Sequence, residues 1–506
     1  MIHLDGHSLT LAQLLSIADG DQQVAVSPAA AAAVDDARAV VDRQSAGDGA
    51  VYGINTGFGS LSEVKIAREA LGDLQRNLLR SHAAGVDAPL SARAVRAMMA
   101  LRANVLAKGY SGIRRVTLER LIDLINRGVH PVVPSRGSVG ASGDLAPLAH
   151  LALVLIGEGS ATVGDDPEIL DGRTALERAG LEPVSLAPKE GLALINGTQA
   201  SAAVGALALA GAERLARAAD IAAALSIDGL RGSYHPFEAR VHEPRPYPGQ
   251  LASADNLFRL LQNSAINRSH ENCGRVQDAY SMRCAPQVHG AGRDALGYAR
   301  SMLEIEANAA TDNPMVFARD EEIVSGGNFH GAPIAIAADV IVIALLQFAT
   351  ISERRSDRLV NPVLSGLEPF LVRESGLQSG YMIAQVTAAA LVSELKTLAH
   401  PASVDTIPTS ANREDHVSMS MAAALKAERA LELASRVVAV ETLLACQALD
   451  LLAPLTTSPA LAAVHAYVRS RIPMLIHDRP PSPDIEWIAR MIADGSLERA
   501  CRAEVK

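Results

Sequence analysis

At residues 137–150 the chain reads Gly137-Ser-Val-Gly-Ala-Ser-Gly-Asp-Leu-Ala-Pro-Leu-Ala-His150. The first half of this stretch consists of small residues, and the second half begins an apolar run that predicts a helix from Leu145 to Leu155. Because residues 140–143 carry no bulky side chain, the backbone can turn back on itself there at small steric cost. The sequence therefore predicts a compact loop, packed between helices, that leads directly into one.

Three residues of this loop, Ala141-Ser142-Gly143, are suited to forming an electrophile from the chain itself. The amide nitrogen of Gly143 can attack the carbonyl carbon of Ala141, and loss of water closes a five-membered ring. Loss of a second water from Ser142 leaves an exocyclic methylene, and the product is a 5-methylidene-imidazol-4-one, an electron-poor alkene able to take up an amine. For the tripeptide alone, a glycine-rich turn or a phosphate cradle is the commoner interpretation. A Walker loop, however, requires a lysine that this stretch lacks.

Outward from the loop, apolar residues recur at helical spacing along much of the chain. Helices are predicted over Leu71–Leu79, Ala94–Leu106, Leu118–Ile125, Thr198–Leu230, Leu296–Asn308, Ala332–Leu359 and Gln378–Ala399. Strand-like alternation is confined to short pieces near the N-terminus and to Ile169–Arg173. The predicted fold class is mainly α, with an elongated central bundle of long helices and a smaller mixed N-terminal region that carries the Ala-Ser-Gly loop. We expect one chain of residues 1–506, with the N-terminal region over 1–200 and the bundle and C-terminal helices over 201–506.

The composition describes an ordered protein with an acidic surface. Of the 506 residues 49% are hydrophobic and 20% are charged, which excludes disorder, and the net charge is −10 without a dense basic block. Nucleic-acid binding therefore has little electrostatic support. The N-terminus lacks the pattern of a signal peptide, and the most apolar stretch, Ile334–Ile351, is interrupted by Asp339 and Gln347. We expect a cytoplasmic enzyme that binds neither nucleic acid nor membrane.

Possible metal ligands and cysteines occur without a recognisable spacing. The four cysteines are scattered and form no C-x-x-C pair: Cys273, Cys284, Cys446 and Cys501. Ligand types also occur at Glu414-Asp415-His416, His289, His330 and His400, but no H-E-x-x-H or comparable motif joins them. We therefore predict no metal site.

The longer string GSVGASGDLAPLAH resembles the signature of the aromatic amino acid ammonia-lyases, and the resemblance covers nearly the whole chain. Other stretches match in order: Tyr52-Gly-Ile-Asn-Thr-Gly-Phe-Gly59, Glu190-Gly-Leu-Ala-Leu-Ile-Asn-Gly-Thr-Gln199, Gln277-Asp-Ala-Tyr-Ser-Met-Arg-Cys284, Asn308-Ala-Ala-Thr-Asp-Asn-Pro314, Gly326-Gly-Asn-Phe-His330 and Glu414-Asp-His-Val-Ser-Met419. The resemblance implies elimination of ammonia across Cα–Cβ of an amino acid. It also implies a methylidene-imidazolone formed autocatalytically from Ala141-Ser142-Gly143, with no external cofactor.

The resemblance also implies a role for individual side chains. Tyr52 corresponds to the base that removes the weakly acidic β-hydrogen, for which it must act as a phenolate or be deprotonated during the reaction. Arg283 corresponds to the clamp on the substrate carboxylate, which a guanidinium binds in a planar, two-bond geometry. Tyr280 lies three residues earlier, close to one helical turn, and is expected to share the site with Arg283. Further polar and aromatic groups around the electrophile and substrate are Asn196, Gln277 and Phe329. Taken alone, each of these residues would be interpreted as an ordinary turn, surface or core residue.

Two positions indicate which amino acid is the substrate. Ser81-His82 stands where phenylalanine lyases usually have Phe-Leu and tyrosine lyases His-Leu, and Ser-His is typical of members that act on histidine. A carboxylate at Glu414 suits an imidazole N–H, whereas it would be buried without compensation against a phenyl ring. The sequence therefore predicts L-histidine as substrate and urocanate as product.

Departures from the family pattern keep other substrates open. Arg413 replaces a usual Gln and could pair with Glu414, Leu395 replaces Asn, and Glu368 replaces Pro. The alternatives are the same chemistry on tyrosine, on a modified histidine or on another aromatic amino acid, and an aminomutase that returns ammonia to the β-carbon. A non-catalytic helical oligomer is a further class, against which the intact set of Tyr52, Ser142 and Arg283 argues.

Assembly is the last expectation from sequence. Long apolar helices such as Ala332–Leu359 offer more hydrophobic surface than one monomer readily covers. The resemblance implies a homotetramer with two-fold symmetry whose active sites draw residues from three subunits.

Overall fold

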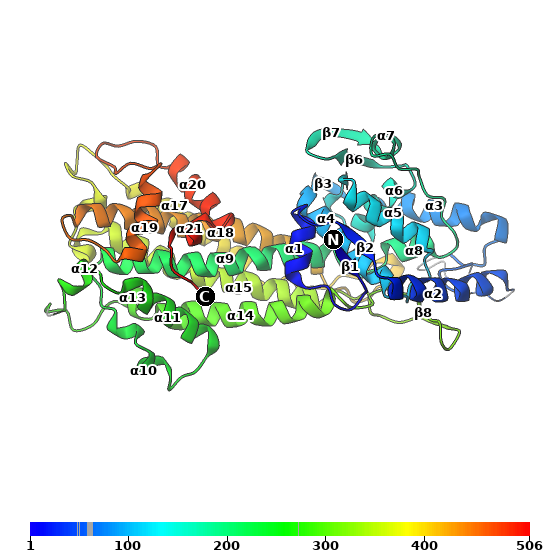
Figure 1. The fold of residues 1–506 in the computed structure, drawn as a ribbon, viewed down its shortest axis with the longest axis horizontal. Helices are drawn as coiled ribbons and strands as arrows, with labels where there is room; N and C mark the ends of the chain where they lie inside the picture. Colours follow the sequence, from blue (N-terminus) through cyan, green and yellow to red (C-terminus); the bar gives the residue numbers. More distant parts are fainter. Residues whose placement is uncertain (48, 50, 58–63, 272) are drawn as a thin grey trace. The chain divides into compact units, whose positions relative to one another are not determined.

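The computed structural model describes residues 1–506 except 48, 50, 58–63 and 272. Contacts divide the chain into two compact units that alternate along the sequence. Unit 1 comprises Met1–Leu207, Arg300–Ala338 and Pro401–Leu425, and unit 2 comprises Ala208–Ala299, Asp339–His400 and Lys426–Lys506. Four helices begin in one unit and end in the other (Figure 1): α9 (Gln199–Gly229), α14 (Ala285–Glu306), α15 (Ala332–Val360) and α18 (Ser420–Leu451). The expected division into residues 1–200 and 201–506 stays a prediction.

Unit 1 contains helices that begin at well-formed caps. The Ser27 hydroxyl accepts a hydrogen bond from Ala30 N at the start of α2, and the Ser91 hydroxyl accepts one from Ala94 N at the start of α4. The helices of this unit are α1 (Leu11–Ala18), α2 (Pro28–Ala46), α3 (Leu71–His82), α4 (Ala92–Ala107), α5 (Arg115–Asn126), α6 (Leu145–Leu155), α7 (Gly172–Arg178) and α8 (Glu190–Ile195), with short 3-10 turns η2 (Arg68–Ala70) and η5 (Ser410–Asn412).

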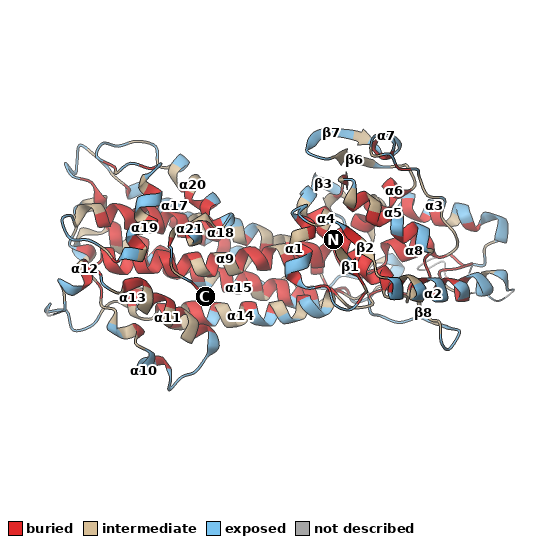
Figure 2. Cartoon of the chain, viewed as in Figure 1, coloured by how far each residue is buried: buried red, intermediate tan, exposed pale blue. Residues whose placement is uncertain are grey.

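The core of unit 1 forms around α4 and α6. From Ala97 to Ala107, α4 is buried on all sides, and it packs against α1 and α5. The apolar run that follows the small-residue loop forms α6, which packs against α3 and α8. Figure 2 shows these helices largely in the buried colour. The loop at residues 137–144 is thus attached to a helix that the core holds firmly.

Short strands surround this core. β1 (Ile2–Leu4) pairs in parallel with β2 (Val24–Val26), β3 (Val86–Pro89) pairs antiparallel with β5 (Pro134–Arg136), and β8 (Met315–Phe317) pairs antiparallel with β9 (Glu322–Val324). A three-stranded antiparallel sheet has the order β4 (Val129–Pro131), β6 (Ser160–Val163) and β7 (Asp166–Asp171). The strands predicted near the N-terminus and around Ile169 are confirmed. Their predicted confinement to those places is wrong, because strands of three or four residues also form elsewhere, at β3, β4, β5, β6, β8 and β9.

Unit 2 consists of helices. Besides its parts of α9, α14, α15 and α18, it contains α10 (Ala239–His242), α11 (Pro248–Leu261), α12 (Ala265–Arg268), α13 (Tyr280–Arg283), α16 (Pro362–Ser365), α17 (Met382–Leu398), α19 (Pro459–Arg469), α20 (Ser482–Ala493) and α21 (Ser496–Ala500), with 3-10 turns η3 (His235–Phe237) and η4 (Pro369–Leu371). Leu431 of α18 packs against Gly211 of α9, and Phe348 of α15 packs against Gly292 of α14. These contacts confirm the predicted bundle of long helices.

Buried polar groups tie the bundle helices of unit 2 together. Glu441 of α18 accepts hydrogen bonds from Ser226 Oγ of α9 (2.7 Å) and from Arg355 of α15, and the side chains of this ion pair are fully buried. On α9, Asp220 accepts from His289 Nδ1 of α14 at 2.7 Å and also pairs with Arg293. Because a buried charge that loses its partner is strongly destabilising, these pairs select which helix faces meet.

The predicted helices all form, although some bounds differ. α14 begins at Ala285, well before the predicted start at Leu296, and α18 was not predicted although it is 32 residues long. Charged residues interrupt the apolar period of α18, and one of them, Glu441, is buried in an ion pair instead of facing solvent. Such a residue hides the amphipathic pattern on which sequence prediction depends.

α15 contains the most apolar stretch of the chain. By length and composition it passes the test for a membrane-spanning helix, with a mean hydropathy of 2.4, but 67% of that window is buried within the protein. A core helix of a soluble protein has the same properties.

The small-residue loop at residues 137–144 lies in backbone contact with a second turn, which contains Gly197. Gly143, with φ +72°, forms a bridge with Gly197, and Asp144 N donates to Gly197 O at 2.7 Å. A Cβ at Gly143 would stand 2.2 Å from that carbonyl oxygen, so the two backbones meet where no side chain fits.

Replacing Gly197 should disturb this crossing. Its φ is +146°, and a Cβ there would stand 2.5 Å from Gln199 Oε1 and 2.6 Å from Arg102 NH1. We expect Gly197→Ala to lower the free energy of unfolding by about 2 to 4 kcal/mol, from backbone strain and overpacking together. Urea unfolding measures this, with Gly326→Ala as control because nothing lies within 4 Å of a Cβ at Gly326. Equal midpoints for the two variants would contradict the expectation.

Candidate active site

Ser142 and Glu414 meet in unit 1, although 272 positions separate them in the sequence. The Ser142 hydroxyl donates to Glu414 Oε1 at 3.1 Å, and Thr409 Oγ1 donates to the other carboxylate oxygen, Oε2. Both side chains are half-buried. Ser142 of the predicted electrophile is therefore hydrogen-bonded to Glu414, the acid for which the sequence predicted a role in substrate selectivity.

A strained turn holds Glu414 in this place. Ser410, Ala411 and Asn412 have φ values of 49°, 55° and 64°, a left-handed turn that costs L-residues about 1–2 kcal/mol each. The turn is closed by Thr409 and Glu414, whose backbones exchange two hydrogen bonds of 3.0 and 3.4 Å. Backbone strain of this kind persists only where surrounding contacts fix it, and it concentrates at functional sites.

Asp144, directly after the tripeptide, is fully buried and links three segments. Its carboxylate accepts from Ser138 Oγ at 2.8 Å and, at the start of α9, from Ser201 N and Ser201 Oγ at 2.7 and 2.8 Å. Burial raises the pKa of this carboxyl above its ordinary value, and the hydrogen bonds from these serines oppose the rise. Asp144 thus anchors the end of the loop to α9.

Arg102 and Asn196 lie behind the crossing of the two glycine turns. Arg102 is fully buried on α4 and donates to the carbonyl oxygens of Ala193 and Asn196 and to Gln199 Oε1. It thereby fixes the turn that contains Gly197. Asn196 is itself 3% exposed, and its Oδ1 has no hydrogen-bond partner among the residues that the structure describes.

His82 lies at the C-terminal end of α3, near Glu414. Its Nδ1 is 2.9 Å from Leu78 O, and because a carbonyl oxygen only accepts, Nδ1 carries the hydrogen in this contact. Burial lowers the pKa of His82, and this outweighs the Leu78 carbonyl and the negative charge of Glu414, which both raise it. The ring is therefore neutral at pH 7, and its Nε2 has a free lone pair.

Tyr52 and Phe329 belong to loops of unit 1. Tyr52 is half-buried in a turn in which Asn55 N donates to Val51 O, while Phe58 and Gly59, at the end of its motif, lie outside the described residues. Phe329 is half-buried in the segment that follows β9. The next residue, His330, stacks on His416 with ring centroids 5.8 Å apart, which sets this segment beside the one that follows Glu414.

Unit 2 contains the remaining predicted site residues. Arg283 NH2 donates to Gln277 Oε1 at 2.9 Å, and its guanidinium carbon lies 4.7 Å from the centroid of the Tyr280 ring. Tyr280 and Arg283 are the first and last residues of α13, as the one-turn spacing predicted. Tyr280 is 72% exposed, which is more than is usual for a tyrosine in a folded protein.

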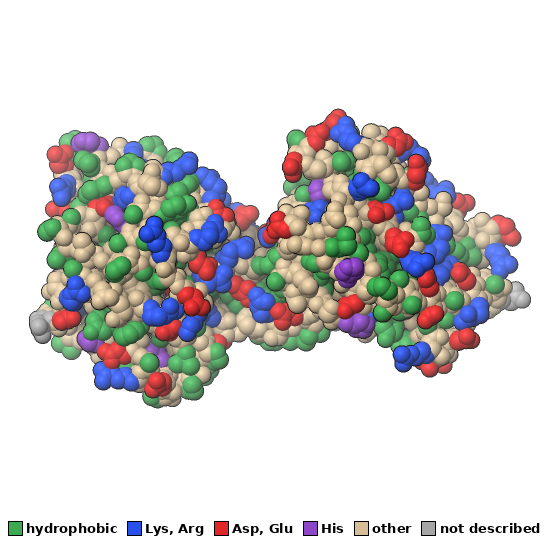
Figure 3. Space-filling view, viewed as in Figure 1, with side chains coloured by type: hydrophobic (Ala, Val, Ile, Leu, Met, Phe, Trp, Pro, Cys, Tyr) green, Lys and Arg blue, Asp and Glu red, His purple; other side chains and the backbone are tan. Residues whose placement is uncertain are grey.

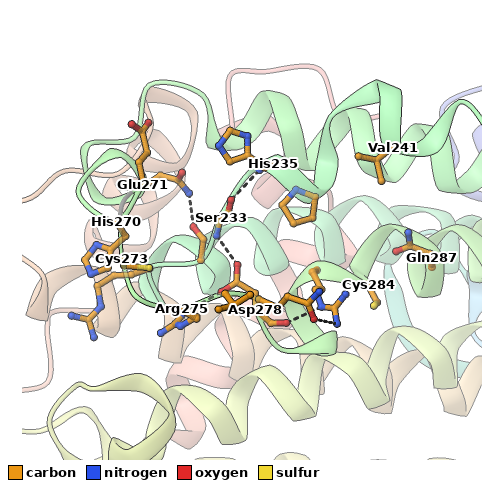
Figure 4. A pocket seen from close by; sticks show the side chains of 17 residues that line it. Ser233, His235, Val241, His270, Glu271, Cys273, Arg275, Asp278, Cys284 and Gln287 are labelled. Atoms are coloured by element: carbon orange, nitrogen blue, oxygen red, sulfur yellow. Dashed lines mark hydrogen bonds and ion pairs between the residues drawn. The ribbon is translucent and has the colours of Figure 1, made fainter.

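Gln277 and Arg283 also line a pocket of about 540 Å³ in unit 2 (Figure 4). Asp278 at its wall accepts a hydrogen bond from Ser233 N at 2.7 Å and is paired with Arg275 at 3.1 Å. Arg231 lines the same pocket. Three arginines, Arg231, Arg275 and Arg283, therefore line one pocket together with two acidic residues, Glu271 and Asp278.

Two departures from the family pattern leave Glu414 unaffected. Within the described part of the chain Arg413 forms no ion pair with Glu414, and Arg413 is exposed. Leu395 is fully buried on α17, as a core leucine. The possibility that Arg413 withdraws Glu414 from a substrate therefore finds no support in the contacts.

Sequence reasoning missed the groups that support the loop: Arg102, Asp144, Thr409 and Ser418. Ser418 Oγ donates to Gly140 O at 2.9 Å; Ser418 lies in the matching stretch that begins at Glu414, but the resemblance assigned it no role, and Thr409 lies outside the matching stretches. Asp144 had a signal, since it stands directly between the tripeptide and an apolar helix. Its partner at Ser201 had none, because only the fold brings them together. Over the described residues, no three His, Cys, Asp or Glu side chains gather as metal ligands.

Comparisons with known proteins agree with this arrangement. The family model described as aromatic amino acid lyase matches residues 9–470. A histidine ammonia-lyase of Anaeromyxobacter dehalogenans is 58% identical over 98% of this chain and 99% of its own length. The crystal structure of histidine ammonia-lyase from Trypanosoma cruzi has a TM-score of 0.91 at 44% identity, covering 99% of this chain and 94% of that one. Tyrosine aminomutase from Streptomyces globisporus has a TM-score of 0.94 at 38% identity, with both chains fully covered.

The first two relatives carry the activity that the sequence predicted, and the third shows that an aminomutase shares the fold. The match to the family model extends over most of the chain, and it includes the Ala-Ser-Gly loop and the turn that ends at Glu414. The predicted resemblance and the mainly α fold class are confirmed. The chain belongs to the aromatic amino acid lyase family.

Proposed function

We propose that this protein is a histidine ammonia-lyase, a carbon–nitrogen lyase that eliminates ammonia from L-histidine to give trans-urocanate. The observation that carries the proposal is the contact of Ser142 with Glu414, beside a neutral His82. It joins the residue of the expected electrophile to an acid that suits an imidazole N–H. The names of the relatives from A. dehalogenans and T. cruzi support the same substrate.

The loop fits a methylidene-imidazolone formed from Ala141-Ser142-Gly143. Gly140 and Gly143 have positive φ values, and Gly197 O lies where a side chain at position 143 would stand. This tight turn without side chains would let the nitrogen of Gly143 approach the carbonyl of Ala141. The unpartnered Oδ1 of Asn196, in the adjoining turn, supports a polar group of the substrate or ring there. The ring would supply an electron-poor alkene that takes up the substrate amino group.

The remaining site residues bind the substrate and move its β-proton. Arg283 would hold the carboxylate through two parallel hydrogen bonds, with Gln277 orienting the guanidinium. Tyr52 would accept the β-proton, and Tyr280, stacked on Arg283, would complete this side of the site. Phe329 would form the aromatic wall behind the ring.

His82 and Glu414 would distinguish imidazole from phenyl. A neutral His82 offers the lone pair of Nε2 as an acceptor, and Glu414 offers carboxylate oxygens. A neutral imidazole supplies one N–H donor to one of these acceptors, and an imidazolium supplies one to each, whereas a phenyl ring supplies none and would leave both unpaired. The Ser142 hydroxyl that bonds Oε1 leaves as water when the ring forms, so that oxygen becomes free for the substrate.

The alternative is a lyase or aminomutase that acts on tyrosine or another aromatic amino acid. The TM-score of 0.94 with tyrosine aminomutase supports this alternative, because that enzyme shares the fold with histidine ammonia-lyase. His82 and Glu414 favour histidine over this alternative.

We further propose a homotetramer in the cytoplasm, with active sites shared between subunits and with a small amino acid as the partner. Support comes from large apolar side chains exposed on unit 2: Ile343, Val363, Leu377, Ile383 and Val386. Association would bury such side chains. Acidic and basic groups are intermingled on the face shown in Figure 3, which favours neither nucleic acid nor an anionic membrane as a partner.

The purified protein should convert L-histidine to trans-urocanate, as followed by NMR of the product. Ser142→Ala should fold normally and lose nearly all turnover, because the methylene carbon derives from the serine side chain. Its near-ultraviolet absorbance should lack the contribution of the ring. A β-amino acid product would identify an aminomutase, and near wild-type turnover in Ser142→Ala would eliminate the proposed electrophile.

His82→Leu should impair histidine selectively. Removing the acceptor leaves a substrate N–H unpaired, so kcat/KM for histidine should fall by about 10- to 100-fold, equivalent to about 1–3 kcal/mol. The same constant for phenylalanine should be unchanged or higher, since a leucine suits a phenyl ring. Equal losses on both substrates would show that His82 does not select the side chain.

Shared sites should allow two inactive variants to complement each other. Ser142→Ala and Arg283→Met each remove one group, and these groups belong to different units of the chain. After joint refolding at equal amounts, about one quarter of the sites should contain both groups intact if different subunits supply them. Each variant refolded alone is the control. No recovered activity in verified mixed tetramers would mean that one subunit supplies both residues.

A further inference from the structure

We propose that Glu414 acts before any substrate arrives, as the acid–base group that removes the Ser142 hydroxyl when the ring forms. This inference rests on the proposed function, since it concerns the same ring. It assigns to Glu414 a role in maturation that is distinct from its proposed role in binding imidazole.

The contact between the leaving group and the acid carries the inference. The oxygen that must leave, Ser142 Oγ, donates to Glu414 Oε1 at 3.1 Å, and Thr409 Oγ1 occupies Oε2. In the chain before ring formation, the carboxylate therefore contacts an atom of the reaction. A carboxylate whose use was confined to substrate binding would not need this contact.

The other titratable groups around the loop are engaged elsewhere. The Asp144 carboxylate accepts from Ser138 and Ser201. His82 Nδ1 bonds to Leu78 O, and Arg413 beside Glu414 is exposed. Among the described residues, Glu414 is the titratable side chain that bonds to the Ser142 hydroxyl.

The strained turn gives a second, independent argument. Three successive residues, Ser410 to Asn412, are left-handed, and the turn delivers Glu414 to the loop. Strain of about 1–2 kcal/mol per residue is retained where a function requires the position. The Thr409–Glu414 bridge directs the carboxylate toward Ser142 while the loop is still unmodified.

The chemistry balances without any other reactant. Loss of the second water breaks the Cα–H and Cβ–Oγ bonds of Ser142 and forms the Cα–Cβ double bond. The carboxylate of Glu414 accepts the proton from Cα and returns a proton to Oγ as the C–O bond breaks, so the hydroxyl leaves as water. Glu414 ends as the carboxylate with which it began.

The departure of this water links maturation to substrate binding. Oε1 loses its serine donor at the moment when the electrophile is complete. The same oxygen can then accept an imidazole N–H. One carboxylate would thus serve both steps in sequence, and the binding site for the side chain would open only in chains whose ring has formed.

The experiment follows intact mass while the full-length protein is synthesised in a cell-free system. Wild-type chains should show a deficit of two waters and the absorbance of the ring. Glu414→Gln keeps the size of the side chain and one acceptor oxygen for the Ser142 hydroxyl, but its amide cannot carry the proton. We expect it to accumulate a deficit of one water and to lose the second at least about 100-fold more slowly.

Two variants control for indirect effects. His82→Leu changes a neighbour that does not contact Ser142, and it should show the two-water deficit at the wild-type rate. Glu414→Asp retains a carboxylate with shorter reach and should mature faster than Glu414→Gln but more slowly than wild type. If Glu414→Gln has a reduced unfolding midpoint, the rate of Glu414→Asp decides.

The outcomes separate the two proposals. If folded Glu414→Gln reaches the two-water deficit at the wild-type rate, the role of Glu414 in maturation is overturned and the proposed lyase activity is unaffected. The same result in Glu414→Asp has this meaning when Glu414→Gln is destabilised. A wild-type chain with full mass and no ring absorbance would contradict the proposed function itself. Slow loss of the second water in His82→Leu as well would show a general disturbance of the site, which also overturns the specific role of Glu414.

Discussion

The site depends on the close approach of two glycine turns. Gly143 and Gly197 meet backbone to backbone, and buried polar groups hold both turns at this crossing. Arg102 holds the turn that contains Gly197 by donating to three acceptors. Asp144 holds the turn that contains Gly143 by accepting hydrogen bonds from Ser201 at the start of α9. Burying Arg102 and Asp144 is costly, and their hydrogen bonds offset part of that cost, although Arg102 Nε has no partner among the residues that the structure describes.

The supporting helices use the same principle at larger scale. In unit 2, ion pairs such as Arg355–Glu441 lie within an apolar bundle and select the matching helix faces. Apolar packing alone would allow the helices to shift along one another by a turn, because an alanine-rich helix face is similar along its whole length. Buried polar groups thus supply specificity both for the loop in unit 1 and for the helix bundle in unit 2.

Much of the fold and part of the site could be predicted from sequence. Periodic helices such as α6 and α15 were found because their apolar residues recur at helical spacing, and α18 was missed because Glu441 interrupts its apolar face from the inside. Short strands such as β4 lack enough residues for a pattern. The tripeptide and Arg283 were recognisable because the stretches around them resemble family motifs, and Tyr280 because it lies one helical turn before Arg283. The contacts of Glu414 with Ser142 and of Arg102 with Asn196 were not, since they join segments far apart in sequence and only tertiary packing brings them together. The roles of these residues in catalysis stay predictions.

The alternation of the two units along the chain has a consequence for biosynthesis. The loop at residues 137–144 receives hydrogen bonds from Met419 N at Val139 O and from Ser418 Oγ at Gly140 O. A ribosome that has completed the first two hundred residues has made the loop, yet it has not made the segment that closes over it. The nascent loop therefore stays open to water until translation has passed the start of α18. Unit 1 can therefore complete its fold only after its last segment, Pro401–Leu425, has been made, and this later part of the gene determines when the earlier part assumes its final form.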